Sequence, residues 1–299
     1  MENFSFKRRT PGEKVFFIFN GILMVFICFI TIYPFINTMA LSFSEGAEAM
    51  RGRVYFFPRV ATWQNYKTVF NDNEILRGYA VTVTRTTLGI LTTLFCTGCL
   101  AYGLSKKYLV GRKFYILICV VSMIFHAGLI PTYMLYKDMG LLNNFLVYIL
   151  PGAVSTFNMI LMKNYFEHMP EELEESAMID GASTMRVVFS IVLPLAMPII
   201  ATISIFTGVG QWNSWFDAYM FVPKKTEIHP LQTYLYRVIS LSQIATQDPQ
   251  EMQLLERMRV NVTTVRSATV MITTIPIIFI YALFQKHFIK GAMVGALKG

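Results

Sequence analysis

Five carboxylates lie within ten residues near the middle of the chain, between two long apolar stretches. They are Glu171, Glu172, Glu174, Glu175 and Asp180. Because a charge in the hydrocarbon core of a bilayer is costly, this segment must lie outside any membrane that the apolar stretches cross. Surface helices that bind lipid usually carry Lys and Arg, since bilayer surfaces are anionic. An acidic segment therefore favours ion pairing with another protein over an ordinary interfacial helix.

A second group of polar side chains lies inside the apolar stretches, where hydrogen-bonding groups are rare. Its members are Arg85, Asn158, Gln211 and Asn213. Ionisable groups at membrane depth are functional by default, and guanidinium and amide groups hydrogen-bond hydroxyl-rich solutes. For Arg85, snorkelling to headgroups or an ion pair with a neighbouring helix carries equal weight. Trp215 fits an interfacial aromatic belt.

Two other patterns suggest chemistry but lack the residues to support it. Cys96 and Cys99 have the CxxC spacing of metal or redox sites, but no second pair and no nearby His accompanies them. Small residues packed on one helix face explain them better. The sequence contains no GxxxxGK[ST] phosphate loop. ATP and Mg²⁺ are therefore not expected to bind this chain.

The composition is that of a membrane protein. Hydrophobic residues make up 54% of the 299 residues and charged residues 15%, whereas soluble domains have about 25% charged residues. The net charge of +8 comes from basic residues that cluster beside apolar stretches, so it reads as an orientation signal and not as a nucleic-acid footprint.

The apolar stretches predict an all-α membrane protein with six transmembrane helices in a single domain, 1–299. A span needs about 20 apolar residues. The expected spans are 15–36, 78–104, 114–136, 141–165, 197–221 and 266–288. The fourth contains Pro151 and Gly152, which a membrane helix tolerates if its neighbours satisfy the freed carbonyls.

The basic residues predict an orientation with both termini in the cytoplasm. Four of them precede the first span, and four more fill the short loop between spans 2 and 3: Lys7, Arg8, Arg9 and Lys14, then Lys106, Lys107, Arg112 and Lys113. Short cytoplasmic loops are enriched in Lys and Arg. Two longer segments, 37–77 and 222–265, then face outward and can fold into small caps. In the second, Tyr234, Tyr236 and Arg237 are of the types enriched at protein interfaces.

The acidic segment, within the loop 166–197, is expected to form two short helices joined by a turn on the cytoplasmic side. Residues 171–179 are helix formers, and acidic groups suit a helix N-terminus. Gly181 can take a positive φ at the turn, and Ser183 or Thr184 can cap the second helix. Ala177, Gly181 and Ala182 leave a small apolar surface at which a partner can approach closely.

This loop resembles the EAA motif of the permease subunits of bacterial ABC importers. The pattern is Glu175-Ser176-Ala177, then Gly181, then Ile191-x-Leu193-Pro194, with Asp180-Gly181-Ala182 at its centre. Ser176 stands where the family often has Ala. The number of spans, the motif between spans 4 and 5 and the C-terminal stretch from Gln285 to Gly299 resemble the carbohydrate-uptake branch.

The resemblance implies a fold, a function and a set of partners. The loop would be a coupling helix that seats on an ATPase, using Glu174, Glu175, Ala177, Asp180, Gly181, Ala182, Leu193 and Pro194. The expected partners are a second permease subunit, a cytoplasmic ATPase dimer that binds ATP and Mg²⁺, and an extracytoplasmic sugar-binding lipoprotein, in the membrane of a bacterium.

Two other classes of function stay open on the sequence alone. A secondary sugar transporter working without an ATPase would need an ion site in the membrane, and the spans lack embedded carboxylates, with Asp217 at an edge. A non-transporting scaffold would not need Arg85, Asn158 or Gln211 along its spans. The ABC permease is not itself expected to be an enzyme.

Overall fold

The computed structural model describes residues 10–125, 127–245 and 262–296, which form helices and turns with an isolated β-bridge between Ser44 and Ala61. The chain divides into two compact units. One comprises Met1–Asn71 and Val238–Ile272, and the other comprises Asp72–Arg237 and Thr273–Gly299. Two long helices, α13 (Leu231–Ala245) and α15 (Val262–Ala296), contribute residues to both units.

The first unit contains α1 (Pro11–Ser42), an apolar helix with a well-defined start. Thr10 accepts a hydrogen bond from the Glu13 amide while the Glu13 carboxylate accepts one from the Thr10 amide, which is a capping box. Pro11 occupies the first helical position, where its missing N–H costs nothing. Apolar side chains are exposed along the helix, as expected of a surface that faces lipid or another chain.

A buried amide organises the remainder of the first unit. The helices α2 (Gly46–Met50) and α3 (Gln64–Phe70) follow α1. From α3, the Asn65 amide nitrogen donates to the carbonyls of Ser42 and Ser44, at 2.9 Å each, and its oxygen accepts from Thr264 of α15 at 2.8 Å. The segment after α1, expected as an outer cap, is therefore folded against its own unit.

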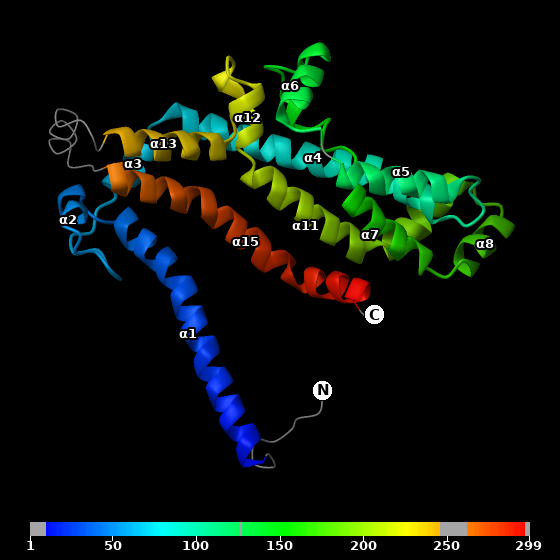
Figure 1. The fold of residues 1–299 in the computed structure, drawn as a ribbon, viewed down its shortest axis with the longest axis horizontal. Helices are drawn as coiled ribbons and strands as arrows, with labels where there is room; N and C mark the ends of the chain where they lie inside the picture. The colour runs from blue at the N-terminus through cyan, green and yellow to red at the C-terminus, as the bar shows by residue number, and fades with distance from the viewer. Residues whose placement is uncertain (1–9, 126, 246–261, 297–299) are drawn as a thin grey trace. The chain divides into compact units, whose positions relative to one another are not determined.

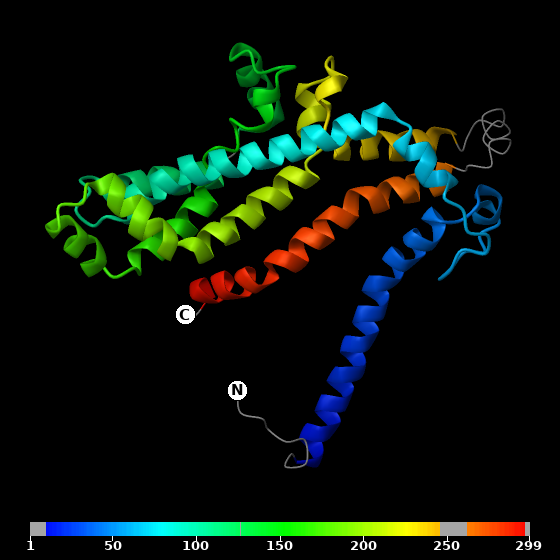
Figure 2. The ribbon, with the colours of Figure 1, turned by 180° about the vertical axis from the view of Figure 1, so that it is seen from behind.

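The second unit is built around three helices that lie side by side: α4 (Asn73–Ser105), α7 (Thr156–Glu167) and α11 (Met197–Asn213) (Figures 1 and 2). Leu104, Met159, Met162 and Ile203 are buried between them. Gly208 on α11 lies against Ile90 of α4, with space for only a small residue, and small residues of this kind let membrane helices approach closely.

Shorter elements connect and flank these three helices. They are α5 (Arg112–Ile124), α6 (Leu129–Asp138), η2 (Phe145–Tyr148), α8 (Glu172–Ile179), α9 (Thr184–Val187), η3 (Val188–Val192), α10 (Leu193–Leu195), α12 (Phe216–Phe221) and η4 (Thr226–Ile228). Of these, η2 and η4 are 3₁₀ helices and η3 is a π-helical turn.

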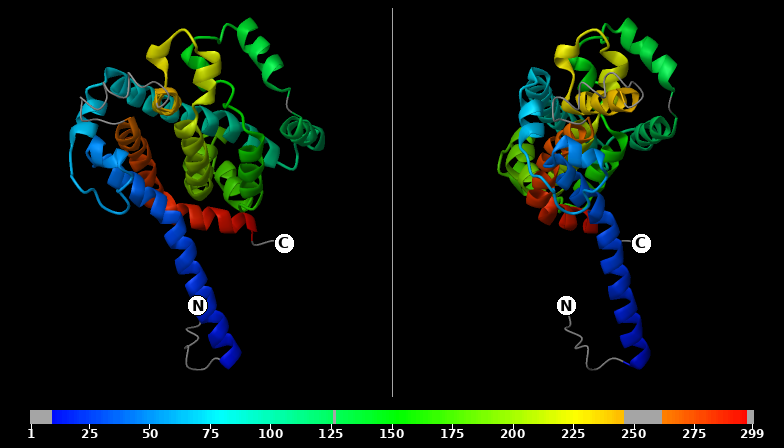
Figure 3. Two further views of the ribbon diagram at one scale, coloured as in Figure 1. Left: turned by 60° about the vertical axis from the view of Figure 1, so that its left-hand side comes forward. Right: turned by 90° about the vertical axis from the view of Figure 1, so that its left-hand side faces the viewer.

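The described residues include three helices long and apolar enough to cross a membrane: α1, α4 and the part of α15 from Val262 to Phe279. Two bent pairs raise this number to five if each pair is one span. The first is α5 with α6, which run in different directions (Figure 3), and the second is Thr184–Leu195 with α11, bent by 77°. Within the described residues, the structure does not show the six uninterrupted spans that the sequence predicts.

The range 141–165, expected as one apolar span, is not one helix. It comprises η2, a turn at Pro151 and Gly152, and α7, which begins only at Thr156. Pro151 has no N–H to donate, so helical bonding fails there. Thr93 of α4 donates to the Gly152 carbonyl at 2.9 Å, and Thr97 donates to the Ala153 carbonyl at 3.1 Å. Neighbouring hydroxyls thus satisfy the backbone that the break exposes.

The range 197–221 is also interrupted. Helix α11 ends at Asn213, and α12 begins at Phe216. No proline or glycine occupies this break, so local sequence does not explain it. Side chains from elsewhere bond its carbonyls: Arg85 donates to Ser214, and Thr233 donates to Trp215 at 3.2 Å. Tertiary contacts therefore hold the break open.

Candidate functional site

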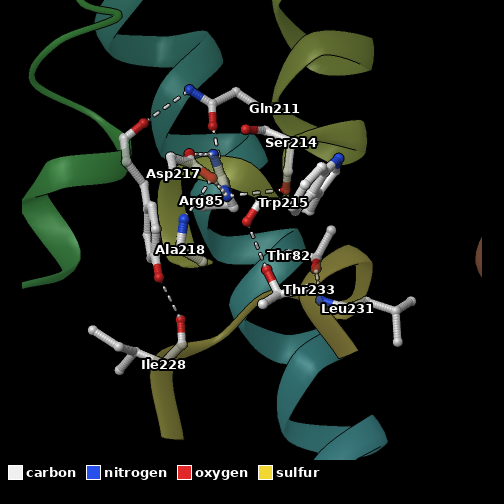
Figure 4. A network of polar contacts seen from close by, with 11 residues as sticks. Thr82, Arg85, Gln211, Ser214, Trp215, Asp217, Ala218, Ile228, Leu231 and Thr233 are labelled. Atoms are coloured by element: carbon white, nitrogen blue, oxygen red, sulfur yellow. Dashed lines mark hydrogen bonds and ion pairs between the residues drawn. The ribbon is translucent and has the colours of Figure 1, made fainter. Parts of the chain in front are cut away.

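Arg85 is the centre of a polar network in the second unit (Figure 4). Its side chain is 1% exposed and projects from the middle of α4. The guanidinium donates to both carboxylate oxygens of Asp217, at 2.5 and 3.3 Å, and its Nε donates to the Gln211 Oε1 at 2.9 Å. It also lies over the Tyr148 ring, 4.4 Å from the centroid. A buried charge is tolerated when it is paired and hydrogen-bonded in this way.

The same network fixes three separate segments on α4. Asp217 belongs to α12, and its Oδ1 also accepts from the Ala218 amide at 2.9 Å. The Gln211 amide nitrogen donates to the Tyr148 carbonyl at 2.9 Å, and the Tyr148 hydroxyl donates to Ile228 at 3.0 Å. On α4, one turn before Arg85, the Thr82 hydroxyl accepts from the Leu231 amide at 2.9 Å. Both broken ranges are therefore tied to one face of α4.

Gly89 gives Gln211 its place in the network. An added Cβ at position 89 would lie 2.9 to 3.0 Å from atoms of the Gln211 side chain, closer than non-bonded atoms tolerate. Gly89 lies on α4 about one turn from Arg85. The absence of a side chain there lets the Gln211 amide reach Arg85 on one side and the Tyr148 carbonyl on the other.

Beside the network lies a cavity of about 340 Å³. Its lining comes from α4, α6, α7, α11, α12 and the broken segment between α6 and α7. The residues are Arg85, Thr93, Tyr136, Val147, Tyr148, Pro151, Gly152, Ser155, Asn158, Thr207, Gly210, Gln211, Ser214, Asp217 and Phe221. This size is at the lower end of small-molecule pockets, which span about 300–1,000 Å³.

Three of the four polar residues expected along a solute path share this cavity: Arg85, Asn158 and Gln211. Asn213 does not line it. Its amide nitrogen donates to the Val209 carbonyl at 3.0 Å, and its oxygen accepts from Gln232. Thr93 and Tyr148 were not expected here from the sequence, and both also line the cavity. Polar residues three to four apart along α4 were the available signal for Thr93.

The acidic segment forms the helix–turn–helix that the sequence predicts, with α8, a turn at Asp180 and Gly181, and α9. Gly181 has φ +83°, and the Ala182 amide donates back to the Ala177 carbonyl at 2.9 Å. Ser183 caps α9 by accepting from the Arg186 amide. We call residues 171–189 the acidic hairpin. It lies beside the C-terminal end of α4 (Figures 1 and 2).

Ion pairs tie the acidic hairpin to the C-terminal end of α4 and the residues that directly follow it. Glu174, whose side chain is 13% exposed, pairs with Lys106 at 2.5 Å and accepts from the Tyr102 hydroxyl at 2.8 Å. Glu171 pairs with Lys107 at 2.8 Å. This pairing holds the pKa of the Glu171 carboxyl below its usual value. Glu174, which we expected among the partner-facing residues, is thus occupied within its own chain.

The other side of the acidic hairpin is open. Glu172 and Glu175 are exposed, and in the described parts of the chain Glu175 makes no ion pair. Apolar side chains are exposed beside them, with Ile179 at 86%, Met185 at 70% and Phe189 at 64%. An exposed patch that combines apolar and unpaired acidic groups is typical of a protein interface.

Aromatic and ionic contacts organise the segment expected as the second outer loop, of which residues 246–261 lie outside the described residues. Trp215 stacks on Tyr236, with ring centroids 4.0 Å apart. Tyr234 donates to Asp72 at 2.7 Å, and Arg237 pairs with Glu74. Tyr234 and Arg237 therefore attach α13 to the start of α4, and Tyr236 attaches it to the break between α11 and α12. Within the described residues, no cluster of three or more His, Cys, Asp or Glu is arranged to hold a metal ion.

The helices and the polar network define a multi-pass membrane protein with broken helices around a polar cavity. The chain belongs to the family described as binding-protein-dependent transport system inner membrane component, which matches residues 87–293. It is therefore a permease subunit of a transporter of this class, found in the membrane. Such subunits are not catalytic themselves.

Curated relatives and a solved structure match nearly the whole chain. Protein LplC of Bacillus subtilis is 37% identical over 97% of both chains. The polygalacturonan/rhamnogalacturonan transport system permease protein YtcP of the same species is 35% identical, over 93% of this chain and 96% of the relative. A crystal structure of a bacterial ABC transporter involved in the import of the acidic polysaccharide alginate contains a chain that is 33% identical. The match has a TM-score of 0.86 and covers 94% of this chain and 99% of that one.

Proposed function

We propose that this chain is one of two permease subunits of an ATP-driven importer of an oligosaccharide in a bacterial membrane. The names of its relatives, which concern polygalacturonan, rhamnogalacturonan and alginate, support a carbohydrate substrate. The family's dependence on a binding protein supports an extracytoplasmic sugar-binding lipoprotein as partner. The second permease subunit and the ATPase dimer complete the proposed assembly. Both termini lie in the cytoplasm, and six crossings are completed by α5 with α6, by α11 and by the broken range 141–165.

The acidic hairpin is the proposed coupling helix, and its two-sided character is the observation that carries the proposal. Its inner side is tied to α4 through Glu174 and Lys106, at 2.5 Å. Its outer side presents exposed, unpaired Glu175 together with exposed Ile179. A movement imposed on the outer side would therefore reach α4, and α4 carries Arg85 beside the cavity. Asp180, Gly181 and Ala182 form the turn, and Leu193 and Pro194 lead into α11.

The cavity is the proposed part of the solute path in this subunit. Arg85, Asn158 and Gln211 line it. We include Asn213 at its edge, because its sequence neighbours Gln211 and Ser214 both line the cavity. The arrangement suits a hydroxyl-rich solute, since amide and hydroxyl groups converge from three helices.

Uptake in cells tests the proposal. Cells lacking this chain should fail to take up tritium-labelled oligosaccharides prepared from pectin and alginate, and the wild-type chain should restore uptake. Glu175→Lys should not restore it, because the reversed charge opposes the basic surface that the hairpin would meet. Glu227→Lys is the matched control, since Glu227 is an exposed acidic residue of η4, outside the hairpin. Full uptake with Glu175→Lys would contradict the coupling role.

A further inference from the structure

Some polar groups around the cavity have hydrogen-bond partners within the protein, and others do not. Arg85 belongs to the first kind. Its Nε donates to Gln211, one terminal nitrogen donates to Asp217 and Ser214, and the other donates to Asp217. Its face is covered by the Tyr148 ring. A guanidinium has five N–H groups in a fixed fork, and here the fork is turned toward the protein.

Three neutral groups are of the second kind. The Thr207 hydroxyl is buried and has no hydrogen-bond partner in the described protein. The Asn158 side chain, 7% exposed, makes no hydrogen bond with the described residues. Ser155 accepts from the Asn158 backbone amide at 3.4 Å, which leaves its own proton to donate. Buried polar groups are normally paired, so Asn158 and Thr207 call for hydrogen-bonding groups inside the cavity. The half-buried Ser155 hydroxyl can donate to the same groups.

The lining carries no net charge. Arg85 and Asp217 are its two charged residues, and they form a bidentate ion pair with each other. Because every other lining residue is neutral or apolar, an anion entering the cavity would lose its hydration without gaining a free cation, which is strongly unfavourable. An uncharged hydroxyl loses less and can bond to Asn158, Ser155 or Thr207.

We infer that the cavity is a subsite for an uncharged glycosyl unit of the transported oligosaccharide, an inference that rests on the proposed function. Asn158, Ser155 and Thr207 hydrogen-bond the hydroxyls of this unit. Tyr136 and Phe221, whose rings lie 4.9 Å apart, provide an apolar wall for its C–H groups. Arg85 and Gln211 are positioning residues: they hold the walls of the cavity in place and leave its charge balanced.

The charge balance is tested first, by thiol reactivity in the assembled transporter. In a chain whose natural cysteines are replaced by Ala, Asn158→Cys is treated with methanethiosulfonates that carry a neutral hydroxyethyl or an anionic sulfonatoethyl group. The ratio of the two rates reports the potential in the cavity. Arg85→Gln, which leaves Asp217 unpaired, should lower the anionic rate relative to the neutral rate by about tenfold, and Asp217→Asn should raise it similarly.

The double variant Arg85→Gln with Asp217→Asn is the decisive comparison. It removes both charges and keeps hydrogen-bonding groups, so it should return the ratio of the Asn158→Cys chain. The contrary result is a ratio of anionic to neutral rate about tenfold lower in the double variant than in the Asn158→Cys chain. It would show that the cavity is normally positive and would overturn the inference. Gel filtration confirms assembly for each variant. A merely structural role of the ion pair would alter assembly without altering this ratio.

The ligand class is tested by protection of the same Asn158→Cys thiol. The probes are α-1,4-galactotriose, maltotriose and trigalacturonate, of which the first and third differ only in a hydroxymethyl or carboxylate group on each ring. Protection by a neutral trisaccharide that exceeds protection by trigalacturonate supports the inference. Equal or stronger protection by trigalacturonate overturns it, and so does protection by none of the three. Neither of these results bears on the proposed function, because the uptake assay tests that function separately.

Discussion

Arg85 of α4 and Asp217 of α12, which are 132 positions apart in the chain, form a bidentate ion pair in which the Arg85 side chain is 1% exposed. The pair joins α4 to α12 just beyond the break that separates α11 from α12, and it fixes α12 beside the cavity. Because each charge is costly to bury alone, α12 is held in this position only when both Arg85 and Asp217 are present. This relationship connects the fold of the permease to the shape of its proposed solute path.

Removing the charge of Arg85 should destabilise the protein strongly. In Arg85→Gln, Asp217 loses its partner in a largely buried site, and breaking a buried pair in this way costs about 3–5 kcal/mol. The melting temperature of the detergent-purified chain, measured by fluorescence-detected gel filtration, should fall markedly. Arg237→Gln is the matched control: the Arg237–Glu74 pair is half exposed, and exposed pairs contribute about 0–1 kcal/mol. Equal effects of the two substitutions would contradict the burial argument.

The hydroxyls of Thr93 and Thr97 should stabilise the break before α7. Valine has the shape of threonine without its hydroxyl, so Thr93→Val with Thr97→Val leaves the Gly152 and Ala153 carbonyls without these donors. A fully buried polar group left without a partner costs about 1–3 kcal/mol, and these two part-buried carbonyls should each cost less than that. Thr87→Val, on an exposed position of the same helix, is the control. Thermal unfolding of both variants measures the difference, and equal melting temperatures would show that the hydroxyls do not support the break.

The sequence could indicate which residues were important in this region but not how they were connected. Arg85 stood out as an ionisable group in an apolar stretch, and an ion pair was one of the interpretations left open. Asp217 appeared only as a residue at a span edge. Their contact depends on the break at Ser214, and no local signal marks this break, because side chains from α4 and α13 hold it. A long-range cause of this kind is absent from the local pattern.

Gly89→Ala should disturb the site although alanine favours helices. The added Cβ would meet the Gln211 side chain at 2.9 to 3.0 Å, so Gln211 must leave Arg85 or the Tyr148 carbonyl. Gly103→Ala in the same helix meets nothing within 4 Å, and there the change should stabilise by about 0.5–1 kcal/mol. In thermal unfolding, Gly89→Ala should lower the melting temperature and Gly103→Ala should raise it. A stabilising Gly89→Ala would show that Gln211 is free to relocate.

The turn of the acidic hairpin should tolerate asparagine but not valine at position 181. Gly181 has φ +83°, and no atom lies near the place of its absent Cβ, so backbone conformation alone sets the preference. A left-handed residue costs about 1–2 kcal/mol, with Asn penalised least and β-branched residues most. Hydrogen exchange of residues 172–187 should rise in Gly181→Val and change little in Gly181→Asn. Equal exchange in the two variants would contradict this account.

Alkaline pH should weaken the attachment of α13 to the start of α4. Burial raises the pKa of Tyr234, and its hydrogen bond to Asp72 raises it further. A pKa that is higher in the folded state stabilises the fold below the unfolded value of about 10 and ceases to do so as pH rises through the folded value. Tyr234→Phe should therefore show a smaller fall in melting temperature above pH 9 or so than the wild type. Parallel curves would contradict the assignment.

Regular apolar segments and capping residues were readable from the sequence, whereas interruptions were not. Residues 171–179 and Ser183 follow the expected helix and cap, because both depend on neighbours in the chain. The ranges 114–136, 141–165 and 197–221 were expected as continuous spans, since hydropathy averages over breaks. Pro151 and Gly152 were visible in the second range, but the donors that stabilise a break there, Thr93 and Thr97, lie in a different helix.

Capture of the ATPase by this chain tests the central claim, that the acidic hairpin couples the permease to ATP hydrolysis. The affinity-tagged wild-type chain, purified from its native membrane in mild detergent, should bring down an ATPase subunit, and so should the Glu227→Lys control. The Glu175→Lys chain, inserted to the same level, should lose the ATPase while it keeps the second permease subunit. Retention of the ATPase by Glu175→Lys, or its absence from the wild-type complex, would contradict the claim.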